Sequence, residues 1–312
     1  MSTHDLPSEV IFPRPLRKGD KIAICSPAGH VNPEYVKASI PVLEEQGWVP
    51  VVMPHALGEN GQFSGTPEER LSDIRTALLD PEIRAILCSR GGYGVVHIME
   101  ELQALPLEKD PKWVIGFSDI SALHALMARR GIASIHSHMT SHLRLGMEDP
   151  DNSALVDILN GKSPVYTFES SPYDRWGVAM GRLVGGNLAV LAELINTPYD
   201  IIRPGTILFI EDVAEPIYKI ERILYQLRLS GVLGNLAGLI VGQFTEYNPD
   251  QNHASMEEMI SAMVAPYTYP VAMNVPIGHV FHNLPVIESA EVTLRVLPDS
   301  PSSLIFHRFG NK

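Results

Sequence analysis

The sequence predicts an α/β protein: an N-terminal domain with a doubly wound parallel sheet, then a smaller C-terminal α/β domain with a mixed sheet or barrel. Three observations predict this class. Short apolar runs alternate with segments of helical periodicity through the first half of the chain. A polar segment with serines and prolines interrupts this pattern over residues 163–181. The chain closes with two runs typical of antiparallel strands, residues 290–297 and 303–306.

The chain has 312 residues, which suffices for two hydrophobic cores. We therefore expect an N-terminal domain over residues 1–162, a linker over 163–181 and a C-terminal domain over 182–312. Hydrophobic residues make up 45% of the chain and charged residues 19%, a composition typical of folded globular proteins.

The net charge of −12 disfavours nucleic acid and anionic membranes as partners. Cys25 and Cys88 lie in apolar runs, so we expect two small buried core residues rather than a disulfide or metal site. The start of the chain lacks the basic-then-apolar pattern of a signal peptide, and no apolar run reaches membrane-spanning length. These features predict a cytoplasmic protein.

Helix-start signals separate the expected strands of the first half. Asn32-Pro33 places a cap before a proline, and Thr66–Glu69 reads as a capping box with proline at the first helical position. Glycines at 47 and 131 end two of the helices. The expected strands cover residues 21–25, 48–53, 85–89, 113–117 and 132–137. Helices are expected over residues 33–46, 67–79, 95–102 and 119–130. One further helix is expected to end near residue 161.

The second half continues the alternation. Ile217, Ile220, Leu224 and Leu227 recur at helical spacing. Further helices are expected over residues 187–195 and 255–264, and strands over 182–186, 206–210, 236–244 and 271–275. The strand over 206–210 is expected to stop at Glu211-Asp212.

Ser118 stands at a predicted strand-to-helix junction. Such a junction can expose a hydroxyl over the end of a sheet and aim the helix's free N–H groups at the atom that it attacks. Gly116 leaves room for close backbone approach. Serine is equally suited to be a helix N-cap, and Ile120 stands where a nucleophile elbow usually has its second glycine.

The loops at the carboxyl ends of parallel strands share one edge of a sheet, so we expect Ser26, Arg90–Gly94 and Ser118 to lie along the same edge. Arg90-Gly-Gly-Tyr-Gly94 offers bare backbone N–H groups there. An ordinary tight turn and a phosphate cradle are alternatives, although the run lacks the Walker spacing and the dinucleotide fingerprint.

Acyl transfer by a serine requires a base and a group that orients the base. Among 12 histidines, His279 stands out because it follows a strand and Gly278 in a turn. Glu211 and Asp212, at the expected end of a strand, are equal candidates for the orienting carboxylate. The alternatives are an exposed loop histidine and solvated carboxylates.

The run from His136 to His142 is a candidate zinc site, since His136 and His138 would share one face of a strand. No carboxylate cluster lies nearby in the sequence. We therefore expect no metal.

Several motifs occur together and in a fixed order, from about Lys21 to the end of the chain. They are Ser89-Arg-Gly-Gly-Tyr-Gly94, Ile115-Gly-Phe-Ser-Asp-Ile-Ser121, Gly185-Gly-Asn-Leu188, Phe209-Ile-Glu-Asp-Val213, Tyr218-Lys-Ile-Glu-Arg222 and Pro276-Ile-Gly-His279. In this combination the chain resembles the LD-carboxypeptidase family of serine peptidases, which includes murein tetrapeptide carboxypeptidases and microcin C immunity hydrolases.

The resemblance implies a Ser-Glu-His triad that falls on Ser118, Glu211 and His279. It also implies that the serine belongs to the N-terminal domain, the other two residues to the smaller C-terminal domain, and the site to the cleft between them. The family often has His-Gly-Pro-Met where this chain has His136-Ser-His-Met139, a departure that bears on substrate choice.

In the implied reaction, Ser118 attacks a peptide carbonyl, and the backbone N–H groups of Asp119 and Gly92 form the oxyanion hole. Arg90, Gly91 and Tyr93 are expected to bind substrate, with Arg90 holding its terminal carboxylate. No cofactor is required.

By resemblance, the substrate is a cytoplasmic murein tetrapeptide that loses its terminal D-alanine, and the enzyme is a homodimer. The alternatives are a microcin C immunity-type hydrolase of acylated nucleotide-like toxins and a non-catalytic two-domain binding protein.

Overall fold

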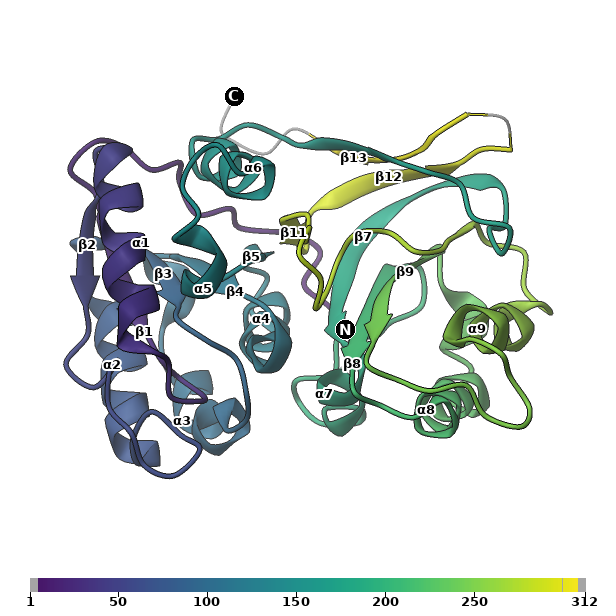
Figure 1. The fold of residues 1–312 in the computed structure, drawn as a ribbon, viewed down its shortest axis with the longest axis horizontal. Helices are drawn as coiled ribbons and strands as arrows, with labels where there is room; N and C mark the ends of the chain where they lie inside the picture. Colours follow the sequence, from purple (N-terminus) through teal and green to yellow (C-terminus); the bar gives the residue numbers. More distant parts are fainter. Residues whose placement is uncertain (1–4, 299, 308–312) are drawn as a thin grey trace. The chain divides into compact units, whose positions relative to one another are not determined.

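A computed structural model describes residues 5–298 and 300–307, and it confirms the α/β class (Figure 1). The chain forms two compact units. The N-terminal unit consists of Pro7–Ser163 and Leu284–Glu288, and the C-terminal unit consists of Pro164–Asn283 and Ser289–His307. The N-terminal unit therefore takes a short segment from late in the chain.

The N-terminal unit is built on a six-stranded sheet. Its strands are β1 (Lys21–Cys25), β2 (Val49–Val52), β3 (Ile83–Cys88), β4 (Trp113–Gly116), β5 (Ser134–His136) and β11 (Val286–Glu288), in the order β11-β5-β4-β3-β1-β2. The first five are parallel, and β11 pairs antiparallel with β5. Because β1 lies between β2 and β3, the loops after β1 and β3 diverge and leave a crevice where ligands of such sheets commonly bind.

Helices cover both faces of this sheet. They are α1 (Pro33–Glu45), α2 (Pro67–Leu79), α3 (Met99–Gln103), α4 (Ser121–Arg129), α5 (Thr140–Leu143) and α6 (Pro150–Leu159). Helix α1 packs beside α5, whereas α2, α3 and α4 form a second group. Asn32 caps α1, and Thr66 and Glu69 form the capping box at the start of α2, as the sequence predicts.

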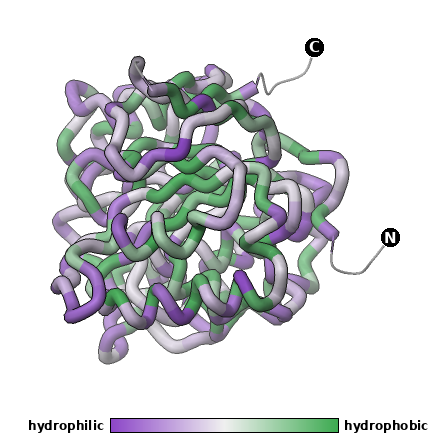
Figure 2. Tube along the Cα trace, turned by 90° about the vertical axis from the view of Figure 1, so that its right-hand side faces the viewer, coloured by the Kyte–Doolittle hydropathy of each residue, from purple (hydrophilic) through white to green (hydrophobic). Residues whose placement is uncertain are grey.

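The C-terminal unit has a mixed seven-stranded sheet. Its strands are β6 (Val165–Phe168), β7 (Gly177–Asn187), β8 (Ile207–Val213), β9 (Gly238–Thr245), β10 (Val271–Ala272), β12 (Glu291–Val296) and β13 (Ser302–Phe306), in the order β10-β9-β8-β7-β12-β13-β6. Its helices are α7 (Leu188–Glu193), α8 (Ile217–Leu229) and α9 (Met256–Val264). Figure 2 shows hydrophobic strands in the middle of the view, with helices and loops of alternating character around them.

Two expectations about the second half differ from the structure. The segment predicted as a linker, residues 163–181, contains β6 and the first part of β7. Strand β6 pairs with β13, which is remote in sequence, so local periodicity gives little sign of it. Strand β8 continues through Glu211 and Asp212 to Val213, across an irregularity in its pairing with β9, and does not stop at Glu211.

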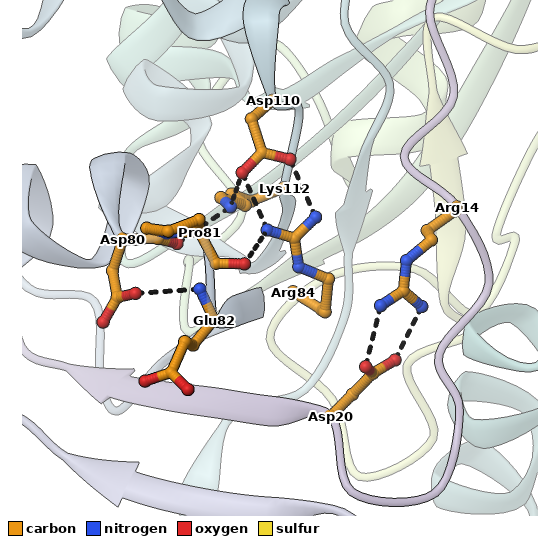
Figure 3. Close-up of polar contacts among 8 residues, drawn as sticks. All are labelled: Arg14, Asp20, Asp80, Pro81, Glu82, Arg84, Asp110 and Lys112. Carbon is orange, nitrogen blue, oxygen red and sulfur yellow. Dashed lines mark hydrogen bonds and ion pairs between the residues drawn. The ribbon is translucent and has the colours of Figure 1, made fainter.

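The amino ends of β3 and β4 are held by a polar network (Figure 3). Arg84 on β3 makes a bidentate ion pair with Asp110, with both N–O distances 2.7 Å. Lys112, whose side chain is buried, pairs with the same carboxylate and donates to the carbonyl of Asp80 at 2.9 Å. The network fixes the start of β4, the strand that ends just before Ser118.

Cys25 and Cys88 are both buried and free, in register on the neighbouring strands β1 and β3. Burial raises the pKa of both thiols, as expected for core residues. Within the described part of the chain, every helix is too short or too polar to cross a membrane.

Candidate active site

Ser118 adopts a backbone conformation that residues other than glycine rarely take. Its φ is +67°, in the left-handed region, and it begins a short 3₁₀ helix, Ser118–Ile120, that leads into α4. The N-cap of this helix is Phe117, not Ser118. Ser118 is therefore not the N-cap of this helix, which is the alternative role that its place in the sequence allows. Strain of this kind is typical of a serine at a sharp strand-to-helix turn.

The buried side chain of His124 supports the end of β4. Its Nε2 lies 2.9 Å from the carbonyl oxygen of Gly116, and its Nδ1 lies 2.8 Å from Oγ of Ser134. A carbonyl only accepts hydrogen bonds, so Nε2 carries the proton and the hydroxyl of Ser134 donates to Nδ1. Burial lowers the pKa of His124 to about 4, which keeps the ring neutral. Nothing in the sequence indicates this role of His124, because a histidine on an apolar helix face is ordinarily a plain core residue.

The glycine-rich loop after β3 packs directly on Ser118. A Cβ atom at Gly91 would lie 2.8 Å from Cβ and 3.0 Å from Oγ of Ser118, so only glycine fits there. The carbonyl of Gly91 accepts the N–H of Gly29 at 2.9 Å, and the carboxylate of Asp119 accepts the N–H of Val95 at 2.9 Å. These contacts hold the loop beside the serine, at the carboxyl ends of β3 and β4.

Arg70, a buried residue of α2, ties two of these loops together. Its Nη1 donates to the carbonyls of Pro27 and Gly94, both at 2.7 Å. Its Nη2 lies 3.1 Å from Nδ1 of His97, and its guanidinium stacks over Phe63. The sequence gives no sign of this role of Arg70 either, since an arginine in mid-helix ordinarily faces solvent.

Arg90 and Tyr93 stand on the exposed side of the loop. Arg90 donates to the carbonyl of His30 at 2.7 Å, and Tyr93 is 47% exposed, with its ring edge against His97. Arg90 lines a pocket of about 510 Å³ in the crevice between the loops that follow β1 and β3. Its lining residues are His30, Val31, Asn32, Pro33, Tyr35, Glu59, Ser89, Arg90, Met139 and Ser141.

In the C-terminal unit, His279 and Glu211 are joined by a hydrogen bond. Nδ1 of His279 donates to Oε2 of Glu211 at 2.7 Å. Glu211 lies on β8 and is fully buried, while the side chain of His279 keeps 21% of its surface exposed. Gly278 has a φ of +126°, and a Cβ there would lie 2.8 Å from both Cβ and Oε2 of Glu211. Close backbone approach thus shapes the turn that carries the histidine.

The charges around His279 set its protonation. Burial lowers its pKa, but the hydrogen bond and negative charge of Glu211, together with Asp212 and Glu246, more than offset burial, so the pKa is raised. Asp212 has a different role. Its carboxylate accepts the side-chain amide of Asn187 at 2.9 Å and the N–H of Ala189 at 2.8 Å, which holds the start of α7. Of the two carboxylates that the sequence left as equal candidates, Glu211 is the one bonded to the imidazole.

The histidine run after β5 is arranged differently from the sequence expectation. His136 ends β5 and lies against Phe117 and His124, whereas His138 and His142 stack on each other. Asp149 and Asp151 lie beside these two rings. The carboxylates that the local sequence lacks are therefore supplied by the start of α6.

Comparison with known proteins assigns the family. Residues 22–137 match the LD-carboxypeptidase N-terminal domain, and residues 180–294 match the C-terminal domain. The probable murein peptide carboxypeptidase of Bacillus subtilis is 33% identical over 276 residues, which cover 86% of each chain.

Two solved structures share the fold. The muramoyltetrapeptide carboxypeptidase from Oxalobacter formigenes has a TM-score of 0.83 at 26% identity, covering 93% of this chain and all of that one. The microcin C7 self-immunity protein MccF, in complex with aspartyl sulfamoyl adenosine, has a TM-score of 0.82 at 21% identity, covering 95% and 98%. The chain therefore belongs to the LD-carboxypeptidase family of peptidases.

Proposed function

We propose that this protein is a serine carboxypeptidase that removes the terminal D-alanine from a murein tetrapeptide, with Ser118, His279 and Glu211 as its triad. The observation that carries the proposal is the hydrogen bond between the buried carboxylate of Glu211 and His279. A buried carboxylate bonded to Nδ1 leaves Nε2 as the basic nitrogen, which is the arrangement that a serine nucleophile requires. The strained backbone of Ser118 adds support.

In the proposed reaction, Oγ of Ser118 attacks the carbonyl carbon of the bond between an L-centre and D-alanine, and Nε2 of His279 accepts the hydroxyl proton. The N–H groups of Asp119 and Gly92 stabilise the oxyanion. His279 then protonates the leaving amine of D-alanine, and water hydrolyses the ester that remains on Ser118. The new chain end would be diaminopimelate or lysine. None of these steps requires a metal or organic cofactor.

The pocket beside Arg90 is the proposed place for the substrate's terminal carboxylate. Arg90 lines it, and the loop that carries Gly91 is packed on Ser118. A guanidinium can hold a carboxylate through two parallel hydrogen bonds. Tyr93, exposed on the same loop, is proposed to contact the peptide.

The direct test is incubation of the purified protein with murein tetrapeptide, with released D-alanine as the readout. Ser118→Ala should lower turnover by about 10⁴-fold or more. Aspartyl sulfamoyl adenosine, offered in parallel, tests the alternative of an immunity-type hydrolase. Cleavage of that compound but not of the peptide would replace the proposed substrate; cleavage of neither would favour the non-catalytic binding protein.

A second experiment tests the triad itself. A fluorophosphonate should label Ser118, as mapped by mass spectrometry, and labelling should slow sharply in His279→Ala. His253→Ala is the matched control, because His253 lies in the same unit and faces Glu221 instead of Glu211. Equal labelling rates in both variants would refute the role of His279.

We also propose that the enzyme acts in the cytoplasm as a homodimer. Three apolar side chains are each at least 59% exposed: Trp176, just before β7, and Val178 and Met180 at its start. Alternate residues of a strand share one face, and an exposed apolar face of this kind suits contact with a second copy. Light scattering should report a dimer for the native chain and a monomer for Met180→Asp.

A further inference from the structure

Three side chains that the proposed reaction does not use converge within the N-terminal unit. His138 follows β5, His142 lies on α5, and Asp151 lies in the first turn of α6. Each offers a nitrogen or oxygen atom, and these atoms lie within 4.8 Å of one another. His138 and His142 are four residues apart and come from one short segment, whereas Asp151 comes from a different helix.

The cluster is almost completely shielded from water. The side chains of His138 and His142 are 8% exposed, and those of Asp151 and Asp149 are 4% and 7% exposed. Two carboxylates in such a place carry two negative charges, which is costly without a compensating cation.

The distances fit ligands of one ion better than they fit a salt bridge. Nε2 of His138 lies 3.6 Å from Oδ2 of Asp151, which is too long for a hydrogen bond. Metal–ligand bonds of about 2.0–2.1 Å in a tetrahedron put neighbouring ligand atoms about 3.3 Å apart. Only a small movement would therefore bring both atoms onto a shared ion. The two imidazoles are adjacent, stacked with centroids 3.5 Å apart, and would turn out of this parallel arrangement to point at one ion.

We propose that His138, His142 and Asp151 bind one divalent transition-metal ion, and that Zn²⁺ suits this set of two nitrogens and one oxygen best. Three protein ligands leave a fourth position for water. Asp149 accepts the N–H groups of Asp151 and Asn152 and lies 3.0 Å from Nε2 of His142, so it orients the ligands from outside.

The ion has a structural role. It would join the segment after β5 to the start of α6, where Asn152 also donates to the carbonyls of His142 and Gly146. The ring of His138 also meets that of Phe117 edge-on, with centroids 6.0 Å apart, and Phe117 precedes Ser118. The site would thus stiffen the protein next to the serine without taking part in hydrolysis.

The test uses the tag-free full chain, stripped with a chelator and titrated with Zn²⁺ in a calorimeter. We expect one ion per chain and a melting temperature about 5 °C higher at a concentration about a hundredfold above the Kd. His142→Ala and Asp151→Asn should each weaken binding by about a hundredfold. Asp157→Asn, an exposed carboxylate on the same helix, should bind like the native chain. The absence of stoichiometric binding to the native chain would overturn the proposal.

A ligand exchange separates direct ligation from a merely structural effect. His138→Cys should still bind Co²⁺ and should add the charge-transfer absorption of a thiolate ligand, which the native chain lacks. A Co²⁺ complex with no such band would show that residue 138 is not a ligand. The stripped chain should keep its peptidase turnover, because the proposed hydrolysis needs no metal. If the stripped chain lost its turnover and Zn²⁺ restored it, the proposal that the ion is only structural would be wrong.

Discussion

Gly91 and Ser118 pack so closely that a single added carbon on the glycine would lie 2.8 Å from Cβ of the serine. The two residues come from the ends of neighbouring strands, β3 and β4, which places a glycine backbone against the proposed nucleophile. The packing keeps any side chain at position 91 away from Ser118, which agrees with the proposal that backbone N–H groups of this loop stabilise an oxyanion.

Gly91→Ala should therefore reduce turnover strongly, by about a hundredfold or more, because the new methyl group must displace Ser118 or the loop that supplies an oxyanion donor. Steady-state kinetics with the murein tetrapeptide measures the effect. Gly61→Ala is the control, because a Cβ at this residue meets nothing within 4 Å. A Gly91→Ala enzyme with native turnover would mean that the loop does not shape the site.

Ser118→Gly should fold more stably than Ser118→Ala. The φ of +67° costs an alanine about 1 kcal/mol that a glycine does not incur, although glycine loses more chain entropy on folding. Urea unfolding of the two inactive variants measures the difference. If Ser118→Ala were instead the more stable by a clear margin, the backbone at this position would not be strained.

Glu211→Gln should lower turnover by about 10⁴-fold and change its pH dependence. The base must be neutral to accept a proton, so activity of the native enzyme falls as the pH drops through the raised pKa of His279. Loss of the Glu211 charge lowers that pKa, so the acid limb of kcat/KM should move to lower pH. A limb that stays in place would mean that Glu211 does not act on the titrating group.

The free energy of unfolding should also depend on pH through the raised pKa of His279. A histidine whose folded pKa is raised contributes stability below its unfolded pKa of about 6.5, and this contribution is lost as the pH rises through the folded value. The difference in unfolding free energy between the native chain and Glu211→Gln should therefore shrink as the pH rises from about 6.5 through the raised pKa of His279. Urea titrations at several pH values would show it.

Lys112→Ala should cost about 3 kcal/mol of stability, since it leaves a cavity and removes a buried partner of Asp110. Lys112→Met keeps the volume of the side chain and should cost less. Lys162→Met, which removes one partner of an exposed pair with Asp157, should change stability by less than about 0.5 kcal/mol. Equal losses of stability in all three variants would contradict the prediction that a buried lysine contributes more stability than an exposed one.

The pH dependence of the same network has a definite sign. Arg84, and then Lys112, lower the pKa of Asp110 to about 2. A carboxylate with a lowered folded pKa contributes stability above its unfolded pKa, near 3.8, and loses it as the pH falls through 2. The free energy of unfolding of Asp110→Asn should therefore be lower than that of the native chain above about pH 3.8. The two values should converge as the pH falls toward 2.

The features that could be predicted from the sequence are those that local residues determine. Caps at Asn32 and Thr66, the position of Ser118 between strand and helix, and the burial of both cysteines all follow from residues within one or two turns. Strand β6 and the approach of Asp151 to His138 depend on contacts between remote segments, which periodicity does not report. The choice of Glu211 over Asp212 required the side chain directions, because both are carboxylates on one strand.

The pairing of β11 with β5 has a consequence for synthesis of the chain. Residues 286–288 complete the sheet of the N-terminal unit, yet a ribosome makes them only after almost all of the C-terminal unit. Until then β5 has an open edge, which invites pairing with other chains. The N-terminal half is thus expected to depend on the late arrival of three residues, and a fragment that stops at residue 163 should aggregate more readily than the whole chain.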